Sequence, residues 1–418
     1  MTMMITNRIN DLIDSKYGLI QRIMKVPEYP GRTMPQVKVY VTTGGLNKVR
    51  GFSASGAGVT DESAIVSAVG EYVERYCALA VEQGNTANIS EIKHQNIEII
   101  DLSLLQNMKN KEQDKLRWTI GQDLLSRTSV AIPSQMVYLS FAQKLGERQH
   151  WVTTATGAAA GQTWSDAVYR GLAECFERDA IQVMWRNQIK IPHIDFLGNH
   201  EIRGFYDKFI ACSSVKFHLY KLITDYDVPA VFGLAEIDDG GVVAAASVRG
   251  TWVDACKKTL IELSQSLVGY SSLIFSKEVQ HYREDFSDVA TYDDHTLLYF
   301  NPHMRKYLEF LLESKETIQL PSDDVVFDDV NTYIQQFLKQ LDAVGVKAIA
   351  VDITTQDIKE FGWFVAKVII PGFADLEPGT ELLYDYERLR QVPLKLLESG
   401  RRKEGHIGGS PIAPHPFP

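Results

Sequence analysis

The sequence predicts an α/β (α+β) fold in which strands and helices alternate. Three observations predict this fold. Short β-branched segments alternate with segments of helical periodicity. The chain is 45% hydrophobic and 23% charged, close to the averages for globular proteins. No low-complexity linker divides the 418 residues, so we expect a single domain over 1–418 with sub-lobes rather than independent domains.

The elements follow in chain order. Apolar residues near helical spacing predict an amphipathic helix within residues 1–20. Residues 153–161 are rich in Gly and Ala, which indicates backbone packed closely against a neighbour. An Asp-Asp-Gly-Gly turn at 238–241 predicts a hairpin between two of the strand segments. The segments with strand composition are 37–43, 230–236, 242–248, 346–354 and 364–370.

Charge and composition exclude several classes of function. A net charge of −10 argues against a general surface for nucleic acid or anionic membrane. The four cysteines include no CxxC pair, which favours a reduced compartment. The N-terminus lacks the apolar core of a signal peptide, and no stretch approaches a membrane-spanning length. We therefore expect a cytoplasmic protein that binds no nucleic acid and no membrane.

An internal repeat carries the strongest chemical pattern. Residues 58–75 align without a gap with residues 161–178 at a constant offset of 103, and a third copy within 251–265 follows at an offset of 88. Each copy begins with a Thr suited to cap a helix. Each then places two acidic or amide side chains three residues apart, on one helix face. The pairs are Glu71 with Glu74, Glu174 with Glu177, and Glu262 with Gln265.

Three such faces are typical of magnesium chemistry, because Mg²⁺ prefers oxygen ligands and shares carboxylates with phosphates. The chain has no GxxxxGK[ST] motif, so a bound nucleotide would need another site. Arg75 and Arg178 could contact phosphate. The alternative is that the acids lie on solvated helix faces. Small residues around the acids in the first two copies favour close packing instead, where bare carboxylates are costly.

These motifs resemble those of the YcaO family. The first motif matches at Ser67, Glu71, Glu74 and Arg75, the second at Glu174, Glu177, Arg178 and Asp179, and the third at Glu262 and Gln265. Similar stretches occur at 291–295, 351–355 and 370–372, so the resemblance spans nearly the whole chain. It implies mixed sheets and helices packed around a nucleotide cleft, with ATP and Mg²⁺ as cofactors.

The resemblance also implies roles for single residues. Magnesium would be held by Glu71, Glu74, Glu174 and Glu177, and ATP by Ser67, Arg75, Arg178, Glu262 and Gln265. Three positions depart from the family pattern. Ala57 stands where many relatives have a lysine, Gly171 where a metal-binding Asn often occurs, and Gly269 where an Arg often follows. We therefore expect a change in nucleotide affinity or in one metal site.

The Pro-rich segment 405–418 ends in a PxPxP sequence. This ending resembles the tail of the azoline-forming branch of the family, in which the terminal carboxylate reaches the active site. The resemblance implies that the carboxylate of Pro418 is the catalytic proton acceptor. His295 and His415 are alternative proton carriers, although a lone His is more often a structural hydrogen-bonder. A disordered tail or an SH3-type ligand is the other interpretation of the segment.

The resemblance implies ATP-dependent cyclodehydration of Cys, Ser or Thr in a ribosomally made precursor peptide, giving thiazolines or oxazolines. Two alternatives stay open: another amide activation that makes thioamides or amidines, and a catalytically impaired scaffold. Implied partners are the precursor peptide, a leader-binding E1-like or ThiF-like protein and an FMN-dependent azoline dehydrogenase. A homodimer is also compatible with the sequence.

Overall fold

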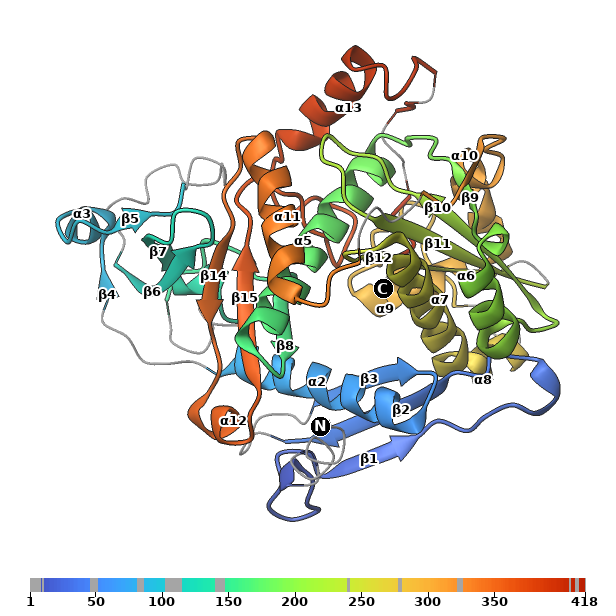
Figure 1. Cartoon of the computed structure of the whole chain (residues 1–418), viewed down its shortest axis with the longest axis horizontal. Coiled ribbons are helices and arrows are strands. Elements are labelled where there is room, and N and C mark those ends of the chain that lie inside the picture. Colours follow the sequence, from blue (N-terminus) through green and yellow to red (C-terminus); the bar gives the residue numbers. More distant parts are fainter. Residues whose placement is uncertain are drawn as a thin grey trace.

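The computed structural model describes residues 9, 11–45, 52–80, 86–101, 115–139, 147–238, 241–276, 280–321, 326–405, 407–409 and 413–417. Within these ranges the strands form three sheets (Figure 1). The first has the order β1-β2-β3: β1 (Arg22–Lys25), β2 (Lys38–Gly44) and β3 (Phe52–Gly58).

The second sheet has the order β12-β11-β10-β9-β13: β9 (His193–Asp195), β10 (Val215–Lys221), β11 (Ala230–Ile237), β12 (Val242–Val248) and β13 (Thr317–Gln319). The third has the order β5-β7-β6-β14-β15-β8, with β4 paired to β6: β4 (Thr86–Ala87), β5 (Glu98–Ile99), β6 (Leu116–Asp123), β7 (Ser129–Pro133), β8 (Ala158–Gly161), β14 (Ile349–Asp352) and β15 (Phe364–Ile369). Parallel pairs, β9 with β13 and β5 with β7, occur beside antiparallel ones, which confirms the predicted α/β class with mixed sheets.

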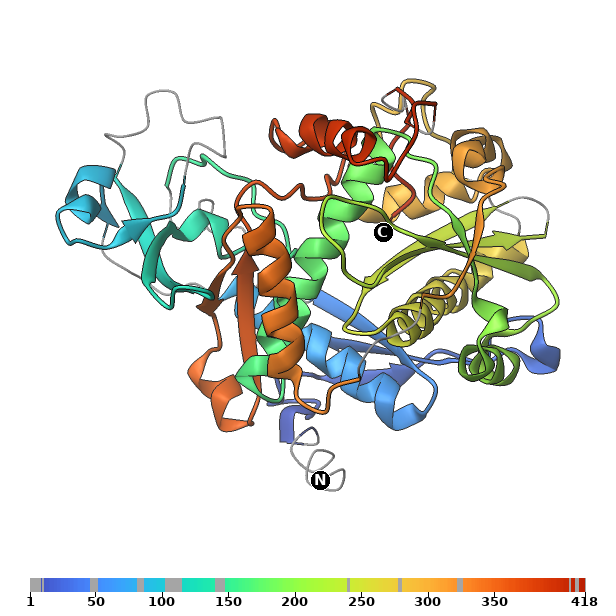
Figure 2. The ribbon, with the colours of Figure 1, turned by 45° about the horizontal axis from the view of Figure 1, so that its top comes forward.

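Three long helices organise the fold: α2 (Asp61–Leu79), α5 (Trp164–Arg186) and α7 (Trp252–Gly269). The shorter helices are α3 (Ile89–Lys93), α6 (His200–Phe205), α8 (Ser271–Ser276), α9 (Tyr292–Tyr299), α10 (Glu309–Leu312), α11 (Val330–Ala343), α12 (Gln356–Glu360) and α13 (Arg388–Glu398). Helix α5 packs against β15 of the third sheet and β12 of the second, so it lies near the middle of the molecule (Figures 1 and 2). No helix in the described ranges is long and apolar enough to span a membrane.

Each long helix is one copy of the sequence repeat and follows a strand directly: β3 precedes α2, β8 precedes α5 and β12 precedes α7. The predicted capping threonines are confirmed. Thr60, Thr163 and Thr251 have extended backbones and accept hydrogen bonds from the amide N–H three residues on. These bonds satisfy backbone donors that a helix start leaves unpaired. The repeat therefore produces three strand–cap–helix units of the same design.

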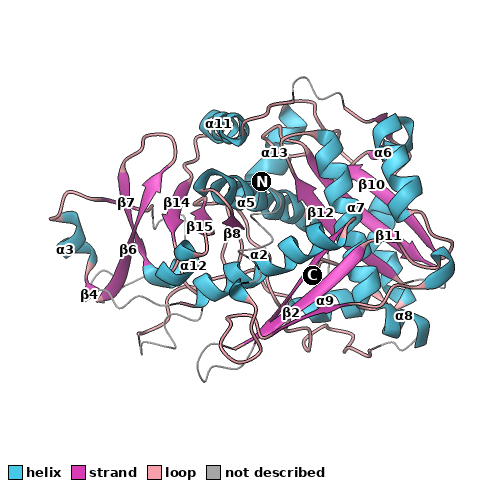
Figure 3. Cartoon of the chain, turned by 60° about the horizontal axis from the view of Figure 1, so that its bottom comes forward, coloured by secondary structure: helices cyan, strands magenta, loops and turns pink. Residues whose placement is uncertain are grey.

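Close backbone packing positions the first unit. A Cβ placed on Gly56 would come within 2.1 Å of the Ala68 nitrogen and 2.6 Å of the Ser67 carbonyl carbon. Only glycine therefore lets β3 lie this close to α2. Ser67, a predicted ATP-binding residue, thus lies where the strand meets the helix. The same relationship appears in Figure 3, where α2 crosses close to the first sheet.

The remaining strand predictions are confirmed and one helix prediction is wrong. Strands β11 and β12 form the predicted hairpin, with Glu236 opposite Val242, and residues 239–240 of its turn lie outside the described residues. The N-terminal helix does not continue to residue 20. Ile13 pairs with Ile20 in an isolated bridge, and the Asp14 carboxylate accepts from the N–H groups of residues 16 and 17. Asp favours such a turn because its side chain competes with helical hydrogen bonds.

Candidate active site

Helix α2 presents its two predicted metal ligands on one face. Arg75 donates to Glu71 through Nη2 at 2.8 Å and Nε at 3.2 Å. Glu74 is half-buried. Burial, and then the nearby carboxylates Glu174 and Glu71, raises the pKa of Glu74 well above its usual range. Arg75 therefore compensates Glu71 more fully than it compensates Glu74.

Helix α5 carries the second acid pair and its arginine. Glu174 Oε2 accepts from the Gly157 N–H at 3.0 Å, and Glu174 Oε1 accepts from Arg178 Nη2 at 3.2 Å. Arg178 Nη1 lies 3.6 Å from Glu177 Oε1. Glu177 is only 7% exposed. Burial raises the pKa of Glu177 to about 8, with Arg178 opposing the shift and Glu262 reinforcing it.

Helix α7 carries the third pair. Glu262 forms an ion pair with Lys258, one turn earlier, at 3.1 Å. Gln265 Nε2 donates to Ser55 Oγ on β3 at 2.9 Å. This hydrogen bond joins the third repeat to the strand that leads into the first.

The three helices bring their acids within electrostatic reach of one another. Glu174 on α5 raises the pKa of Glu74 on α2, and Glu262 on α7 raises the pKa of Glu177 on α5. Across the described residues, no three His, Cys, Asp or Glu side chains are gathered closely enough to form a ready-made metal cage. Instead Glu71, Glu174 and Glu262 each bind a basic residue of their own helix. The acids thus surround one region without forming a closed cluster.

These residues fit a magnesium-bound anion. Mg²⁺ is usually held by one or two carboxylates together with substrate phosphates rather than by a protein cage. Glu74 and Glu177 have raised pKa values, and a divalent cation would offset the cost of ionising them. Arg178 Nη1 is buried and has no hydrogen-bond partner in the described part of the chain. Such a donor is suited to a phosphate oxygen.

The C-terminal tail is buried next to this region. Tyr299 Oη donates to the carbonyl of Pro414 at 2.7 Å, and His295 Nδ1 lies 2.7 Å from the carbonyl of His415. The two imidazole rings stack with centroids 4.1 Å apart. Phe417 then lies over Arg178, with 4.5 Å between the guanidinium carbon and the ring centroid. These contacts fit the structural hydrogen-bonding role that the sequence left open for both histidines.

Pro418, the predicted catalytic residue, lies outside the described residues. Asp179, matched in the second motif, is fully buried and binds Arg388 with its carboxylate. Asp179 therefore takes part in a structural ion network. The structure separates it from Glu174, Glu177 and Arg178, which face the other repeats.

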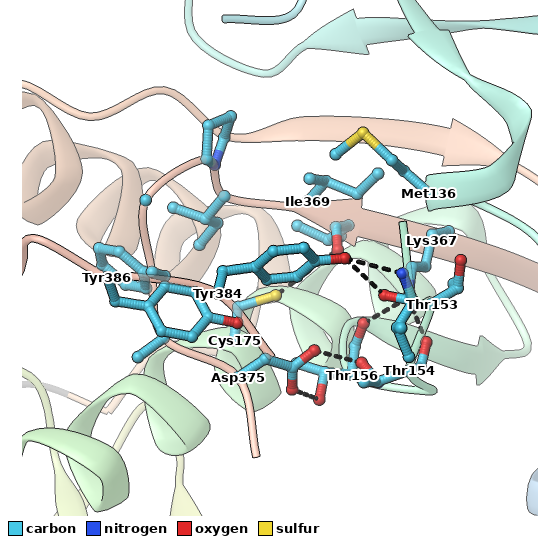
Figure 4. Close-up of a pocket in the computed structure, with 17 residues that line it drawn as sticks. Met136, Thr153, Thr154, Thr156, Cys175, Lys367, Ile369, Asp375, Tyr384 and Tyr386 are labelled. Atoms are coloured by element: carbon cyan, nitrogen blue, oxygen red, sulfur yellow. Dashed lines mark hydrogen bonds between the residues drawn. The ribbon is translucent and has the colours of Figure 1, made fainter. Parts of the chain in front are cut away.

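Sequence reasoning missed Lys367 on β15. Its ammonium group donates to the carbonyls of Thr154 at 2.8 Å and Thr156 at 2.7 Å (Figure 4). It thereby holds the segment that ends at Gly157, the residue that donates to Glu174. Burial lowers the pKa of Lys367, and the nearby carboxylates, Asp375 first, oppose this shift. Only the strand prediction for 364–370 hinted at this position, because a lysine amid apolar residues breaks the pattern.

The departure at Gly171 has a packing cause. A Cβ on Gly171 would come within 2.6 Å of the Gly157 carbonyl oxygen, so an Asn cannot fit at this position without moving the backbone. Gly157 has a φ of +78°, a conformation that favours glycine. The backbone of Gly157 thus occupies the space beside α5 and offers its own N–H to Glu174.

The fold and this site define an α/β protein with acidic helices arranged for a metal-bound phosphate ligand. Residues 55–374 match the family model described as YcaO cyclodehydratase, ATP- and Mg²⁺-binding. The chain therefore belongs to the YcaO family. The expectation of ATP and Mg²⁺ as cofactors is confirmed by this family description.

Related sequences have no assigned activity in their names. An uncharacterized protein in the tfuA 3′ region of Rhizobium leguminosarum bv. trifolii is 30% identical over 210 residues, 48% of this chain and 48% of that protein. An uncharacterized protein of Methanothermobacter thermautotrophicus is 25% identical over 327 residues, 76% of this chain and 80% of that protein. The match thus spans about half the length of the Rhizobium relative.

Solved structures share the fold. A heterocyclase in complex with substrate and cofactor superposes with a TM-score of 0.74 at 17% identity, over 98% of this chain and 57% of that one. YcaO from Methanopyrus kandleri, bound with AMPPCP and Mg²⁺, gives 0.63 at 19% identity, over 85% and 86% of the two chains. The E. coli microcin synthetase McbBCD complex with pro-MccB17 bound gives 0.57 at 17% identity, over 84% and 88%.

Proposed function

We propose that this chain is an ATP- and Mg²⁺-dependent peptide cyclodehydratase. Its substrates would be Cys, Ser or Thr residues of a ribosomally made precursor peptide, and its products thiazolines or oxazolines. The observation that carries the proposal is the contact between Phe417 and Arg178. It supports the proposal because the tail, whose sequence resembles that of the azoline-forming branch, contacts the arginine that binds Glu174 and lies beside Glu177.

The residues of the three helices would hold the cofactors. Glu71, Glu74, Glu174 and Glu177 are the proposed Mg²⁺ ligands. Ser67, Arg75, Arg178, Glu262 and Gln265 are the proposed contacts to ATP. Bound with Mg²⁺, ATP supplies the γ-phosphoryl group that converts the substrate amide oxygen into a phosphate leaving group.

The protein's own contribution is positioning and charge. The Gly157 N–H and Arg178 fix both oxygens of Glu174, so this carboxylate is oriented before a metal arrives. The buried Arg178 Nη1 donor remains for phosphate.

The substrate side chain attacks the preceding carbonyl carbon and loses its proton. One carbon–oxygen bond breaks, the amide proton leaves, and the peptide loses one water per ring. We assign proton acceptance to the carboxylate of Pro418. The anchored tail supports this assignment because residues 413–415 hold the approach to Phe417 rigidly.

Recognition of the peptide is proposed to need a separate leader-binding protein of the E1-like or ThiF-like type. The structural likeness to the E. coli microcin synthetase, which was solved as a complex with pro-MccB17 bound, supports looking for such a partner.

The test measures phosphate release from Mg-ATP and the mass of the peptide product. It uses the purified chain, the proposed leader-binding partner and the precursor peptide. We expect loss of one water mass per modified residue. Glu71→Gln and a one-residue extension after Pro418 should abolish the loss, whereas Glu62→Gln, at an exposed position of α2, should not. ATP use without loss of water would indicate another amide activation, such as thioamide formation. No ATP use would favour a scaffold and overturn the proposal.

A further inference from the structure

A cavity of about 100 Å³ lies beside the candidate active site. Figure 4 shows the residues that line the cavity. Its wall includes Cys175, which directly follows Glu174 on α5. The wall also includes Thr156, which directly precedes Gly157, the hydrogen-bond donor to Glu174. The cavity and the proposed metal ligand Glu174 are therefore separated by a single layer of chain.

Most of the cavity wall is apolar. Met136, Ile369, Phe373 and Tyr386 contribute apolar surface from three separate segments, since Ile369 and Phe373 belong to one continuous stretch of the wall. In Figure 4, Met136 and Ile369 lie at one end and Tyr386 at the other. An apolar cavity of about 150 Å³ holds a benzene-sized molecule. A cavity of this smaller size is suited to one aliphatic side chain.

Lys367 provides a polar group with an unused hydrogen-bond donor. It is only 4% exposed and lines the cavity. An ammonium group has three N–H donors, and two of them bind the carbonyls of Thr154 and Thr156. Among the described residues, Nζ has no third acceptor. A buried donor of this kind calls for an acceptor in the cavity.

The surrounding charges decide what kind of acceptor fits. Asp375, Glu174 and Glu74 all lie within electrostatic reach of Lys367. The Asp375 carboxylate is already occupied by the hydroxyls of Thr154 and Thr156. Because three carboxylates offset one ammonium charge, a neutral carbonyl oxygen is favoured over an anionic ligand.

We propose that this cavity is a subsite for the peptide substrate. It takes one aliphatic side chain of the peptide, and Lys367 donates its third N–H to a backbone carbonyl of the same segment. A side chain and a carbonyl together are what one peptide residue offers. This inference rests on the peptide substrate of the proposed function. Val152 lines the cavity and is 47% exposed, so it marks a route from solvent.

The test measures binding without ATP, partner or turnover. N-acetyl-leucine methylamide and N-acetyl-glycine methylamide are compared by saturation-transfer NMR on the whole chain. Val152→Trp places an indole at the mouth of the cavity. Ile120→Trp is the matched control, since Ile120 is 49% exposed and does not line the cavity. Both changes are at exposed positions, so both proteins should fold.

We expect a signal for the leucine probe with the wild type and Ile120→Trp, and its loss with Val152→Trp. The glycine probe should give little signal with any of them. Lys367→Met should weaken binding of the leucine probe about fivefold or more, because one hydrogen bond from a charged donor is lost. Equal signals for the two probes, or a leucine signal that survives Val152→Trp, would overturn the subsite. Failure of cyclodehydration would leave these results unchanged, so the two proposals fail separately.

Discussion

The ring of Phe417 covers the guanidinium group of Arg178 at 4.5 Å. Arg178 in turn binds Glu174 and lies beside Glu177. A cation–π contact of this kind contributes about 0.5–2 kcal/mol, and it restricts the plane of the guanidinium fork. The tail therefore takes part in the geometry of the acidic site through one aromatic residue.

Replacing Phe417 by Ala should reduce the rate of peptide modification. The expected loss is about 2- to 30-fold, the range that corresponds to the cation–π energy. Phe417→Tyr keeps an aromatic ring over Arg178 and should retain most of the rate. Phosphate release at saturating and limiting ATP distinguishes a change in kcat from one in KM. A wild-type rate for Phe417→Ala would show that the stack does not orient Arg178.

Replacing Glu174 by Gln should weaken Mg²⁺ binding at least about tenfold, because a ligand charge is lost and the Gly157 and Arg178 contacts change. Titration of the ATP-free protein with Mn²⁺, followed by electron paramagnetic resonance, measures this directly. Glu62→Gln removes a carboxylate from the exposed first turn of α2 and serves as the control. If both variants bind Mn²⁺ as the wild type does, Glu174 is not a ligand.

The sequence predicted the local features of the three long helices better than the tertiary contacts around them. The caps and the acid pairs depend on local spacing, so Thr60, Thr163 and Thr251 could be predicted as caps from their neighbours alone. Lys367 could not be predicted, because its carbonyl acceptors at 154 and 156 come from a distant segment. The packing of Gly157 against α5 likewise depends on tertiary contacts.

The difference between local spacing and tertiary contacts also explains the role of Asp179. By sequence it continues the second motif, yet a helix turns about 100° per residue. Asp179 therefore faces away from Glu177 and into the core. The helix prediction for the N-terminal segment was wrong for the opposite reason. Its helical periodicity is outweighed by a local turn, in which the Asp14 carboxylate accepts from the N–H groups of Lys16 and Tyr17.

Removing the Asp179 carboxylate should destabilise the protein strongly. Asp179 and Asp225 both bind Arg388, at 2.9 and 2.7 Å, and Asp179 is fully buried. Deleting one partner of a buried pair costs about 3–5 kcal/mol because it leaves a charge uncompensated. Asp179→Asn should therefore lower the urea midpoint markedly. Asp385→Asn, in the exposed pair with Arg390, should change stability by about 1 kcal/mol or less. Similar midpoints for the two variants would contradict the structural role.

Mild acid should weaken the anchoring of the tail. His415 is fully buried and stacked on His295, and its Nε2 lies 3.2 Å from the Glu377 carbonyl oxygen. Burial, and then the charge of His295, lowers the pKa of His415 well below its usual range, and burial also lowers the pKa of His295. Below about pH 6.5 the unfolded chain binds protons that the folded chain excludes. Stability is therefore lost as the pH falls below that value, by up to about 1.4 kcal/mol per pH unit for each histidine.

This effect is measured by thermal unfolding of the wild type and His415→Gln between about pH 7.5 and 5. The loss of stability should begin near pH 6.5, the usual pKa of histidine in an unfolded chain. Glu377 contributes with the opposite sign, since burial raises its pKa to about 7, but it is present in both proteins and largely cancels in the difference. The wild type should lose more stability than His415→Gln as the pH falls, because the variant has one fewer excluded proton. Parallel curves would mean that His415 accepts its proton without leaving its stack on His295, and would contradict the acid-induced weakening of the tail.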